Sequence, residues 1–522
     1  MSSTVLKLRT VLIFSFAIIL SILGGYLVAK PLNYTSLAFF VGLGFLFALP
    51  LLLRWHFPLL ILCWNTNMVV LGLKGQPPFW LFMIAISFSL TCLYYALDKR
   101  QKYLYVPSVI APLIFLAGVV VLTAKIRGGI GLNMFGGGES GGKRYIFILA
   151  PIVGYFALTA HRIPWNRAYA YVVTFFIGFG SSAIAVALPF LPSFLWFLFA
   201  IFPPEMSSFE NLDLIEKQSI TRFGGLTTLS TAIFCILLAC YGIRGILNLS
   251  SPLKFLPFSL RGGFEITRPW RMIFFLGALA VSFLGGFRSA IIVLALLFSI
   301  QFYFERLFRS RLFPILAGIA VTVAVCILPI TDHLPLSMQR TLSFLPVNVD
   351  PAARLDAAVS TEWRLQIWRR VLPEVPDYFW VGKGFSLNTR EMELLSSPAS
   401  TEQNNTIEMA ILAQDYHSGP LTLLLPLGIG GLIGFIWFLI ASIKVLLKNY
   451  RNSPPQLLTL NTFLLSYFMA RSIFFFLIFG SFYSDLLSFV GVIGLSISLN
   501  HGVNEKKRSA IPEIQPLQLI EA

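Results

Sequence analysis

Long apolar segments separated by short polar ones recur along the whole chain. Most of them approach the roughly 20 residues that an α-helix needs to cross the hydrocarbon core of a bilayer. The pattern predicts about fourteen membrane-spanning helices and therefore an all-α polytopic membrane protein. The predicted spans cover residues 11–29, 36–53, 57–73, 79–97, 106–124, 145–160, 169–189, 226–247, 271–285, 287–304, 312–330, 418–443, 457–475 and 482–499.

The first apolar run follows two basic residues, Lys7 and Arg9, as the hydrophobic part of a signal peptide would. The residues that end it, Tyr26 to Pro31, offer no clear small-residue cleavage site. We therefore interpret this run as a signal-anchor helix that stays in the protein.

Two stretches depart from the simple picture of one run for each span. Residues 272–304 are too long for one helix, and Gly285-Gly286 offers a turn between two short ones. Residues 190–202 are apolar but flanked by proline, which predicts an interfacial or re-entrant segment.

Basic residues gather between the spans and set the orientation of the chain. When the N-terminus is placed in the cytoplasm, nearly every compact basic cluster falls on the cytoplasmic side, as the positive-inside rule requires. The C-terminus is then cytoplasmic too, whereas the basic residues of 125–144 fall on the opposite side. The predicted cytoplasmic loops are 98–102, 161–167, 244–271, 305–311 and 444–451.

The same alternation leaves one large periplasmic loop, 331–406. Within it, apolar side chains recur every fourth residue, which is the pattern of an amphipathic helix, and prolines 373 and 376 end the pattern. We expect this helix to lie in the membrane interface or to cap a cavity. The apolar positions are Leu355, Val359, Trp363, Ile367 and Val371.

Composition excludes a water-soluble protein. Only 12% of the residues are charged, against about a quarter in soluble domains, and the mean hydropathy is +0.79. The net charge of +16 comes mostly from basic loops beside apolar runs, so it indicates membrane topology and lipid contact rather than a nucleic-acid partner. All five cysteines lie in apolar runs without metal-site spacing, so we predict no disulfide framework and no zinc site. The sequence also lacks a Walker A motif and an HExxH motif, and we expect no cofactor.

Four ionisable residues lie at or just inside the predicted outer ends of spans. Charge at membrane depth is costly and usually functional. Guanidinium groups bind phosphate oxygens bidentately, so two arginines at one depth indicate a pyrophosphate site, and a histidine there can take a proton from a hydroxyl. The simpler alternative is that each is an interfacial polar group, with Arg471 extending to the lipid headgroups. The four residues are Arg222, Arg288, His417 and Arg471.

Around these residues the chain resembles the O-antigen ligase/polymerase family of bacterial envelope enzymes, over about residues 215–445. The most specific motif is His417-Ser418 followed, after nine residues, by Gly428-Ile429-Gly430-Gly431, which is similar to the family's ligase signature. Ile292 and Leu432 stand where the family often has Leu and Thr. The other similar segments are Arg222-Phe223-Gly224-Gly225, Phe287-Arg288-Ser289-Ala290, Arg364 to Trp368 and Val381 to Gly384.

This resemblance implies a reaction and the residues that perform it. In the family, a sugar chain on undecaprenyl pyrophosphate is transferred to an acceptor hydroxyl at the periplasmic face of the bacterial inner membrane, without a nucleotide sugar or a metal. The anomeric carbon would be inverted, and the acceptor would be lipid A–core, a growing glycan or another hydroxyl. Arg222 and Arg288 would bind the pyrophosphate, His417 would be the catalytic base, and Arg364 and Arg471 are candidates for further substrate contacts.

The chain is expected to have three parts: N-terminal helices in 1–210, a ligase-like core in 211–450, and C-terminal helices with a tail in 451–522. A ligase, a polymerase and a protein O-oligosaccharyltransferase share the donor and differ in the acceptor, so the sequence leaves all three open. The alternative outside the enzymes is a multi-pass polysaccharide/lipid transporter or flippase. The lack of an obvious internal repeat and the charges at one face count against it.

Overall fold

The computed structural model describes residues 34–71, 76–98, 103–129, 142–203, 222–248, 258–259, 265–386 and 403–504, with scattered positions between 14 and 29. The chain divides into two compact units, Met1–His56 and Phe57–Ala522. The predicted first span, 11–29, lies mostly outside the described residues.

Apolar helices dominate the described chain. Eight are long and apolar enough to cross a membrane, and three shorter apolar helices accompany them. The protein is therefore an all-α multi-pass membrane protein, whereas the count of about fourteen spans stays a prediction. The long ones are Phe79–Leu97 (α3), Pro107–Arg127 (α4), Trp165–Phe190 (η2 to η4), Gly224–Leu247 (α10), Leu312–His333 (α13 and η7), Gly419–Arg451 (α19), Pro455–Leu477 (η10 and α20) and Phe482–Leu499 (α21); the shorter ones are Phe47–Cys63 (the second part of α2, Tyr34–Cys63), Trp270–Leu284 (α11) and Arg288–Phe304 (α12).

Short elements connect these helices or cap them. They include the 18-residue helix α5 and a two-stranded antiparallel sheet, β1–β2. Their bounds are Gly142–Thr159 (α5), Ala168–Ile177 (α6), Ser182–Ala187 (α7), Leu198–Ile201 (α8), Phe258–Ser259 (β1), Glu265–Ile266 (β2), Leu307–Arg309 (η6), Leu328–His333 (η7), Leu336–Leu342 (α14), Pro351–Val371 (α15), Leu372–Glu374 (η8), Val375–Tyr378 (α16) and Gln403–Leu412 (α18).

The two predicted spans 36–53 and 57–73 are wrong as separate elements. One continuous helix, α2, runs from Tyr34 to Cys63, and the chain turns after Cys63. Arg54 and His56 interrupt the apolar run, but neither residue type breaks a helical backbone. A gap in hydropathy therefore does not mark a gap in the helix.

The predicted turn within 272–304 is confirmed. Helix α11 ends at Leu284 and α12 begins at Arg288, with Gly285 and Gly286 between them. Gly286 has a φ of +76°, which residues with a side chain rarely adopt, and a Cβ on Gly285 would collide with Thr227 of α10. The two glycines thus bring the start of α12 close to the start of α10.

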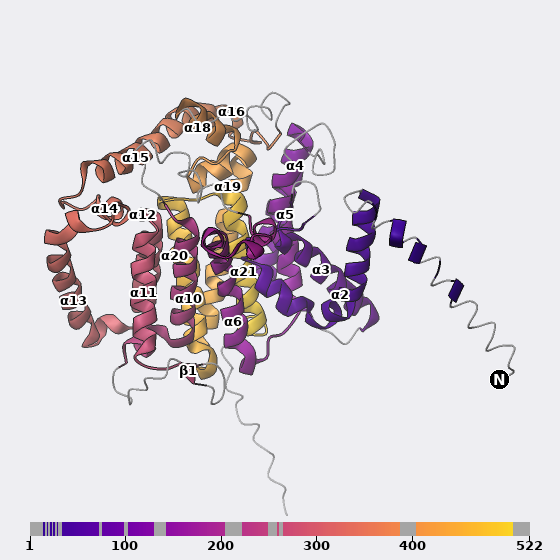
Figure 1. Ribbon diagram of the computed structural model, residues 1–522, viewed down its shortest axis with the longest axis horizontal. Coiled ribbons are helices and arrows are strands. Elements are labelled where there is room, and N and C mark those ends of the chain that lie inside the picture. Colours follow the sequence, from indigo (N-terminus) through magenta and orange to yellow (C-terminus); the bar gives the residue numbers. More distant parts are fainter. Residues whose placement is uncertain are drawn as a thin grey trace, which may run out of the picture. The chain divides into compact units, whose positions relative to one another are not determined.

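Helices from distant parts of the sequence pack together in the larger unit. Helix α21 packs against α5, α19 packs against α4 and α20, and α10 packs against α11 and α20. Aromatic rings fill the centre, where Phe435 contacts Phe475, Phe482 and Phe489 with centroids 5.1–5.6 Å apart. In contrast, α13 buries none of its residues and lies at the edge of the bundle (Figure 1).

The amphipathic helix expected in loop 331–406 is confirmed as α15. Asp350 caps it by accepting a 2.7 Å hydrogen bond from the Ala352 backbone, and the helix ends at Val371, before Pro373. Ile367 and Val371 are buried in a cluster with Tyr416 and Leu425. The first half of the apolar stripe remains outside this cluster, since Leu355 is 66% exposed.

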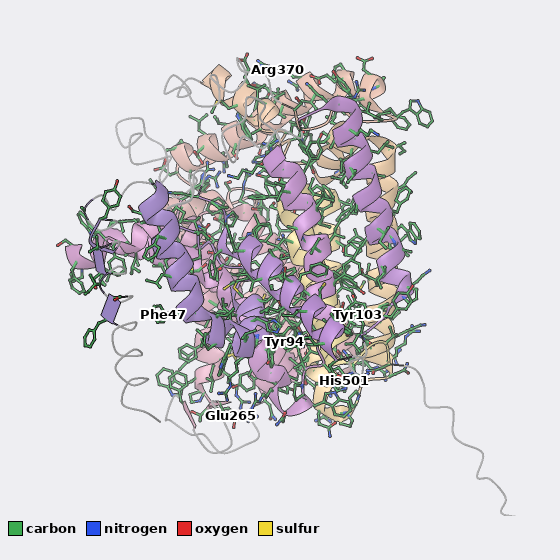
Figure 2. The ribbon with its side chains drawn as sticks, turned by 90° about the vertical axis from the view of Figure 1, so that its right-hand side faces the viewer. Phe47, Tyr94, Tyr103, Glu265, Arg370 and His501 are labelled. Atoms are coloured by element: carbon green, nitrogen blue, oxygen red, sulfur yellow. The ribbon has the colours of Figure 1, made fainter. Side chains whose placement is uncertain are left out.

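The two ends of the bundle differ in what covers them. Helices α15, α16 and α18 lie across one end, and β1 lies at the other (Figure 1). Figure 2 places Arg370 of α15 at the end opposite to Tyr94, Glu265 and His501. Glu265 and His501, which belong to segments predicted to be cytoplasmic, therefore lie at one end, and α15 of the large loop lies at the other.

Candidate active site at the capped end

Arg222 and Arg288 meet at the capped end of the bundle. Arg222 lies two residues before the first residue of α10, and Arg288 is the first residue of α12. A nitrogen of Arg222 donates to Asp356 at 3.2 Å, and one of Arg288 donates to the Ala357 carbonyl at 2.9 Å. Both side chains thus reach one turn of α15, although they are far apart in sequence.

Two further charged residues complete this cluster and were not identified from the sequence. Arg340 of α14 is only 3% exposed and forms an ion pair with Asp356. Its other nitrogen donates to the Gly286 carbonyl at 2.6 Å. Nothing in the sequence distinguishes Arg340 from the other arginines of the loop, because its partners come from α15 and from the α11–α12 turn.

Arg364 of α15 adds a fourth positive charge. We call Arg222, Arg288, Arg340 and Arg364, together with the Asp356 carboxylate that pairs with Arg222 and Arg340, the arginine cluster. Burial lowers the pKa of the Arg364 guanidinium, and the charges of Arg288 and Arg222 lower it further. Burial and then the charge of Arg222 likewise lower the pKa of Arg340, against the opposing effect of Asp356. The cluster therefore has an excess of positive charge, which favours an anionic ligand.

His417 lies between two aromatic rings in the segment before α19. Trp363 and Phe479 contact it edge to face, at centroid distances of 5.0 and 4.8 Å. Its Nδ1 lies 3.2 Å from the Asp415 carbonyl oxygen. A carbonyl oxygen only accepts hydrogen bonds, so this contact places the proton on Nδ1 and leaves the Nε2 lone pair available as a base.

The Asp415 carboxylate lies beside the same imidazole, with Oδ1 3.4 Å from Nδ1. Burial by itself raises the pKa of Asp415, but the contact with His417 and the charge of Arg144 outweigh burial and hold this pKa below its ordinary value. Asp415 is therefore ionised at neutral pH. Its charge stabilises the imidazolium that forms when His417 accepts a proton.

Phe479 connects the histidine to the arginine cluster. One side of the connection is the contact with His417, and the other is the Arg364 guanidinium, 5.9 Å from the centre of the Phe479 ring. Trp368 also donates to the Tyr416 carbonyl at 2.8 Å, which holds α15 against the segment that carries His417. His417 therefore lies close to Arg364, at the same end of the bundle as Arg222 and Arg288.

The glycines of the histidine motif allow a close backbone contact. Helix α19 is kinked at Gly428, whose φ is +67°, so the motif is a kink within a helix and not a turn between helices. The Lys383 and Gly384 amides donate to the Leu425 and Pro426 carbonyls at 2.7 and 3.0 Å. A Cβ at Gly382 would collide with Pro426. The loop after α16 is thus bonded to the helix that follows His417.

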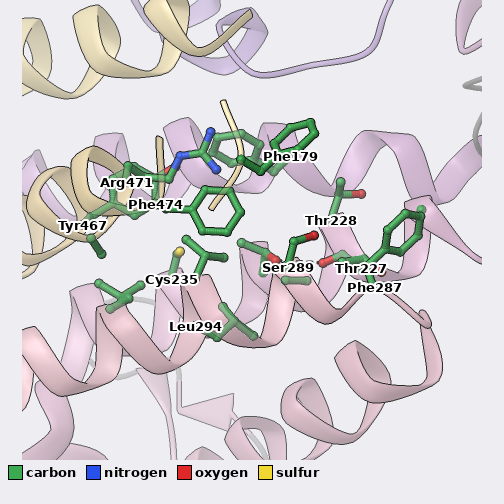
Figure 3. A pocket seen from close by; sticks show the side chains of 17 residues that line it. Phe179, Thr227, Thr228, Cys235, Phe287, Ser289, Leu294, Tyr467, Arg471 and Phe474 are labelled. Carbon is green, nitrogen blue, oxygen red and sulfur yellow. Dashed lines mark hydrogen bonds between the residues drawn. The ribbon is translucent and has the colours of Figure 1, made fainter. Parts of the chain in front are cut away.

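A cavity of about 310 Å³ lies beside the arginine cluster, between α10, α12 and α20. Phe287 and Ser289, on either side of Arg288, line it, and so does Phe479. Most of its wall is apolar, with the hydroxyls of Thr227, Thr228 and Ser289 on one side (Figure 3). An apolar chain attached to a charged head group would fit this arrangement.

Arg471 lies in the wall of this cavity and does not join the arginine cluster (Figure 3). It forms an ion pair with Asp485, which also accepts a 2.9 Å hydrogen bond from the Ser481 backbone. The alternative that Arg471 extends to lipid headgroups does not fit this internal pairing. Its candidate role in substrate contact stays a prediction.

The described residues contain no group of three or more His, Cys, Asp or Glu that would hold a metal ion. The positive charge of the site comes from guanidinium groups, which carry it at any physiological pH.

Comparison with protein families supports the resemblance seen in the sequence. Residues 273–436 match the O-antigen ligase family. The match includes Arg288, Arg340, Arg364 and His417, whereas Arg222 and Arg471 lie outside it. No curated protein matches the chain. The protein is thus a multi-pass membrane protein with a segment, residues 273–436, that is similar to the O-antigen ligase family.

Proposed function

We propose that this protein transfers an oligosaccharide from undecaprenyl pyrophosphate to an acceptor hydroxyl, as an O-antigen ligase or a surface-polysaccharide polymerase. One observation carries the proposal: Arg222, Arg288 and His417 converge at one end of the bundle, next to an apolar cavity. A transferase of this kind needs an anion site, a base and space for a lipid chain, and the three lie side by side here.

The arginine cluster supports the role of pyrophosphate ligand. The cluster holds four guanidinium groups and one carboxylate, so bringing in a pyrophosphate reduces the repulsion among the arginines. Arg222 and Arg288 would stabilise the negative charge that grows on the pyrophosphate as it leaves the sugar. Arginine donors fixed in place before the reaction do this without reorganising in the transition state.

His417 supports the role of general base. Its Nε2 would accept the proton of the acceptor hydroxyl while the hydroxyl oxygen bonds to the anomeric carbon. The bond from that carbon to the pyrophosphate oxygen breaks as the new bond forms, so the configuration is inverted. The proton stays on His417 as an imidazolium, next to Asp415, and is then lost to solvent.

The orientation of the site follows from the positive-inside rule. Predicted cytoplasmic segments border the end opposite to α15 (Figure 2). We therefore place the arginine cluster at the periplasmic face of the inner membrane, with both termini in the cytoplasm. The lipid chain of the donor would lie among the apolar helices, with the cavity accepting the part nearest to the pyrophosphate.

A lipid transporter or flippase is the second candidate. The observation that favours it is the Arg471–Asp485 pair in the cavity wall, because charges within a membrane often mark the path of a substrate. Removing both Arg222 and Arg288 separates the two functions. Lipid movement that survives this double change would favour the transporter.

The test is a transfer assay in membrane vesicles with a lipid-pyrophosphate oligosaccharide as donor and no added nucleotide. Lipid A–core, the growing glycan and a protein are offered as acceptors, so the product distinguishes ligase, polymerase and protein transferase. We expect His417→Ala to lower the rate by about 10²–10⁴-fold, the usual contribution of a general base. Full activity of His417→Ala, at equal protein levels, would rule out this mechanism.

A further inference from the structure

The arginine cluster contains a carboxylate that two arginines share. The Oδ2 atom of Asp356 accepts from Arg222 at 3.2 Å and also from Arg340. Asp356 is largely buried, with 18% of its side chain exposed. A carboxylate at this position reduces the positive charge that attracts pyrophosphate. Asp356 must therefore have another role than attracting the ligand.

Arg340 links this carboxylate to the α11–α12 turn. Its Nε donates to Asp356 and its Nη1 donates to the Gly286 carbonyl at 2.6 Å. Gly286 lies two residues before Arg288, in the left-handed conformation that directs the start of α12. The Arg340 guanidinium therefore holds the backbone that presents Arg288, using two donors of one rigid plane.

A continuous chain of contacts results. It runs from the Gly286 carbonyl through Arg340 and Asp356 to Arg222. Arg288 is joined to the same turn of α15 through the carbonyl of Ala357, the residue after Asp356. Arg222 and Arg288 are thus linked through side chains of α14 and α15, in addition to the direct bond from the Phe223 amide to the Gly285 carbonyl at 3.3 Å.

We propose that Arg340 and Asp356 are positioning residues, which fix Arg222 and Arg288 at the spacing that a pyrophosphate requires. The inference rests on the proposed function and adds two residues to it. Neither residue is expected to contact the lipid-pyrophosphate donor. The Asp356 carboxylate repels phosphate, and the Nε and Nη1 atoms of Arg340 already donate hydrogen bonds to Asp356 and to the Gly286 carbonyl. Fixing the two ligand arginines in advance removes the need to order them during the reaction.

The first test is Arg340→Lys in the purified full-length protein. Lysine keeps the charge but has no planar fork, so it cannot hold Asp356 and the Gly286 carbonyl at once. We expect inorganic pyrophosphate to bind about tenfold more weakly and kcat to fall about tenfold to a hundredfold, as misplaced binding groups cause. Pyrophosphate affinity equal to that of the wild type would overturn the inference.

The matched control lies on the same helix. Arg369 and Glu362 form an exposed ion pair on α15, with 3.2 Å between nitrogen and oxygen. Arg369→Lys and Glu362→Gln make the same chemical changes outside the cluster. We expect both to leave pyrophosphate affinity and kcat within about twofold of the wild type, as exposed pairs contribute little.

A second variant tests the positioning role if the Arg340→Lys protein does not accumulate in the membrane. Asp356→Asn keeps the size and one acceptor oxygen but removes the charge that holds both arginines. We expect kcat to fall at least about tenfold, while the KM for the donor does not rise, because the site becomes more positive. A smaller fall in kcat overturns the inference.

The double variant tests whether the two residues act as one unit. If they do, Arg340→Lys/Asp356→Asn lowers kcat no further than the more damaging single change. Effects that multiply would overturn the inference. If the proposed function is wrong, the wild type transfers no sugar. The pyrophosphate affinity of Arg340→Lys still shows, in that case, whether Arg340 positions the anion site.

Discussion

Two arginine–aspartate contacts in this protein differ in the balance of their charges. At the capped end, Asp356 faces Arg222 and Arg340, with Arg288 and Arg364 close by. In the cavity wall, Arg471 pairs with Asp485. The first region keeps an excess of positive charge, whereas the second is internally neutral.

Under the proposed function, the first region is a site for a ligand and the second is an element of the fold. Charges that are matched within the protein satisfy each other, and Asp485 is further bonded to the Ser481 backbone. Charges in excess are satisfied only when an anion arrives. Membrane depth alone, on which Arg471 was selected from the sequence, does not make this distinction. The balance of charge around the residue does.

The largest expected effect comes from breaking the balanced pair. Asp485→Ala leaves the guanidinium of Arg471 without its partner inside the membrane, which costs about 3–5 kcal/mol in buried pairs. We expect the amount of folded protein in the membrane to fall sharply, measured by detergent-solubilised size-exclusion chromatography. The double variant Arg471→Leu/Asp485→Leu should recover folded protein. If Asp485→Ala alone accumulates like the wild type, the pair is not an element of the fold.

A large effect on activity, without loss of protein, is expected in the unbalanced region. Arg288→Gln removes one ligand of the leaving pyrophosphate, and loss of one such electrostatic stabiliser costs about 10²–10³-fold in kcat. Thermal unfolding should stay close to that of the wild type, because the change reduces repulsion among arginines. Transfer kinetics and thermal unfolding measured on the same preparation check this. A loss of stability that parallels the loss of activity would contradict it.

A smaller effect is expected from salt. Pyrophosphate inhibition should weaken several-fold between about 0.05 and 0.5 M NaCl, since ions screen an exposed positive field over a shorter distance as their concentration rises. The matched Arg471–Asp485 pair should not respond. Inhibition constants across this range, with unfolding temperatures as the comparison, provide the measurement. Salt-independent inhibition would argue against an excess of charge at the site.

The smallest expected effect is a pH-dependent change in stability that arises from Asp415. Its folded pKa lies below the ordinary value of 3.8, so the folded state favours the carboxylate. The resulting stabilisation is complete above the unfolded pKa and is lost as the pH falls through the folded value. We therefore expect the unfolding temperatures of the wild type and Asp415→Asn to differ at neutral pH and to converge below pH 4. A difference that grows on acidification would show the opposite sign.

The sequence predicted those parts of the structure that depend on local pattern. The turn at Gly285-Gly286 and the helix α15 follow from residue types within a few positions of each other. The continuity of α2 was missed because polar residues were taken as a break. Arg222, Arg288 and His417 were chosen by motif, and the structure brings them to one end of the bundle.

The rest depends on contacts between distant segments. Arg340 and Asp356 join the arginine cluster only because α14 and α15 approach the start of α12. No local sequence pattern predicts this approach. The partner of Arg471 was missed for the same reason, since Asp485 lies on the next helix. The cavity between α10, α12 and α20 is likewise a product of packing.

The positions of Arg222 and Arg288 along the chain have a further consequence. Helix α10 begins two residues after Arg222, and α12 begins at Arg288 itself. The start of an α-helix carries about half a positive elementary charge from its aligned peptide dipoles. Two positive helix poles therefore reinforce the guanidinium groups at the capped end. A protein that lacked both side chains would keep both poles, so part of its attraction for anions belongs to the backbone.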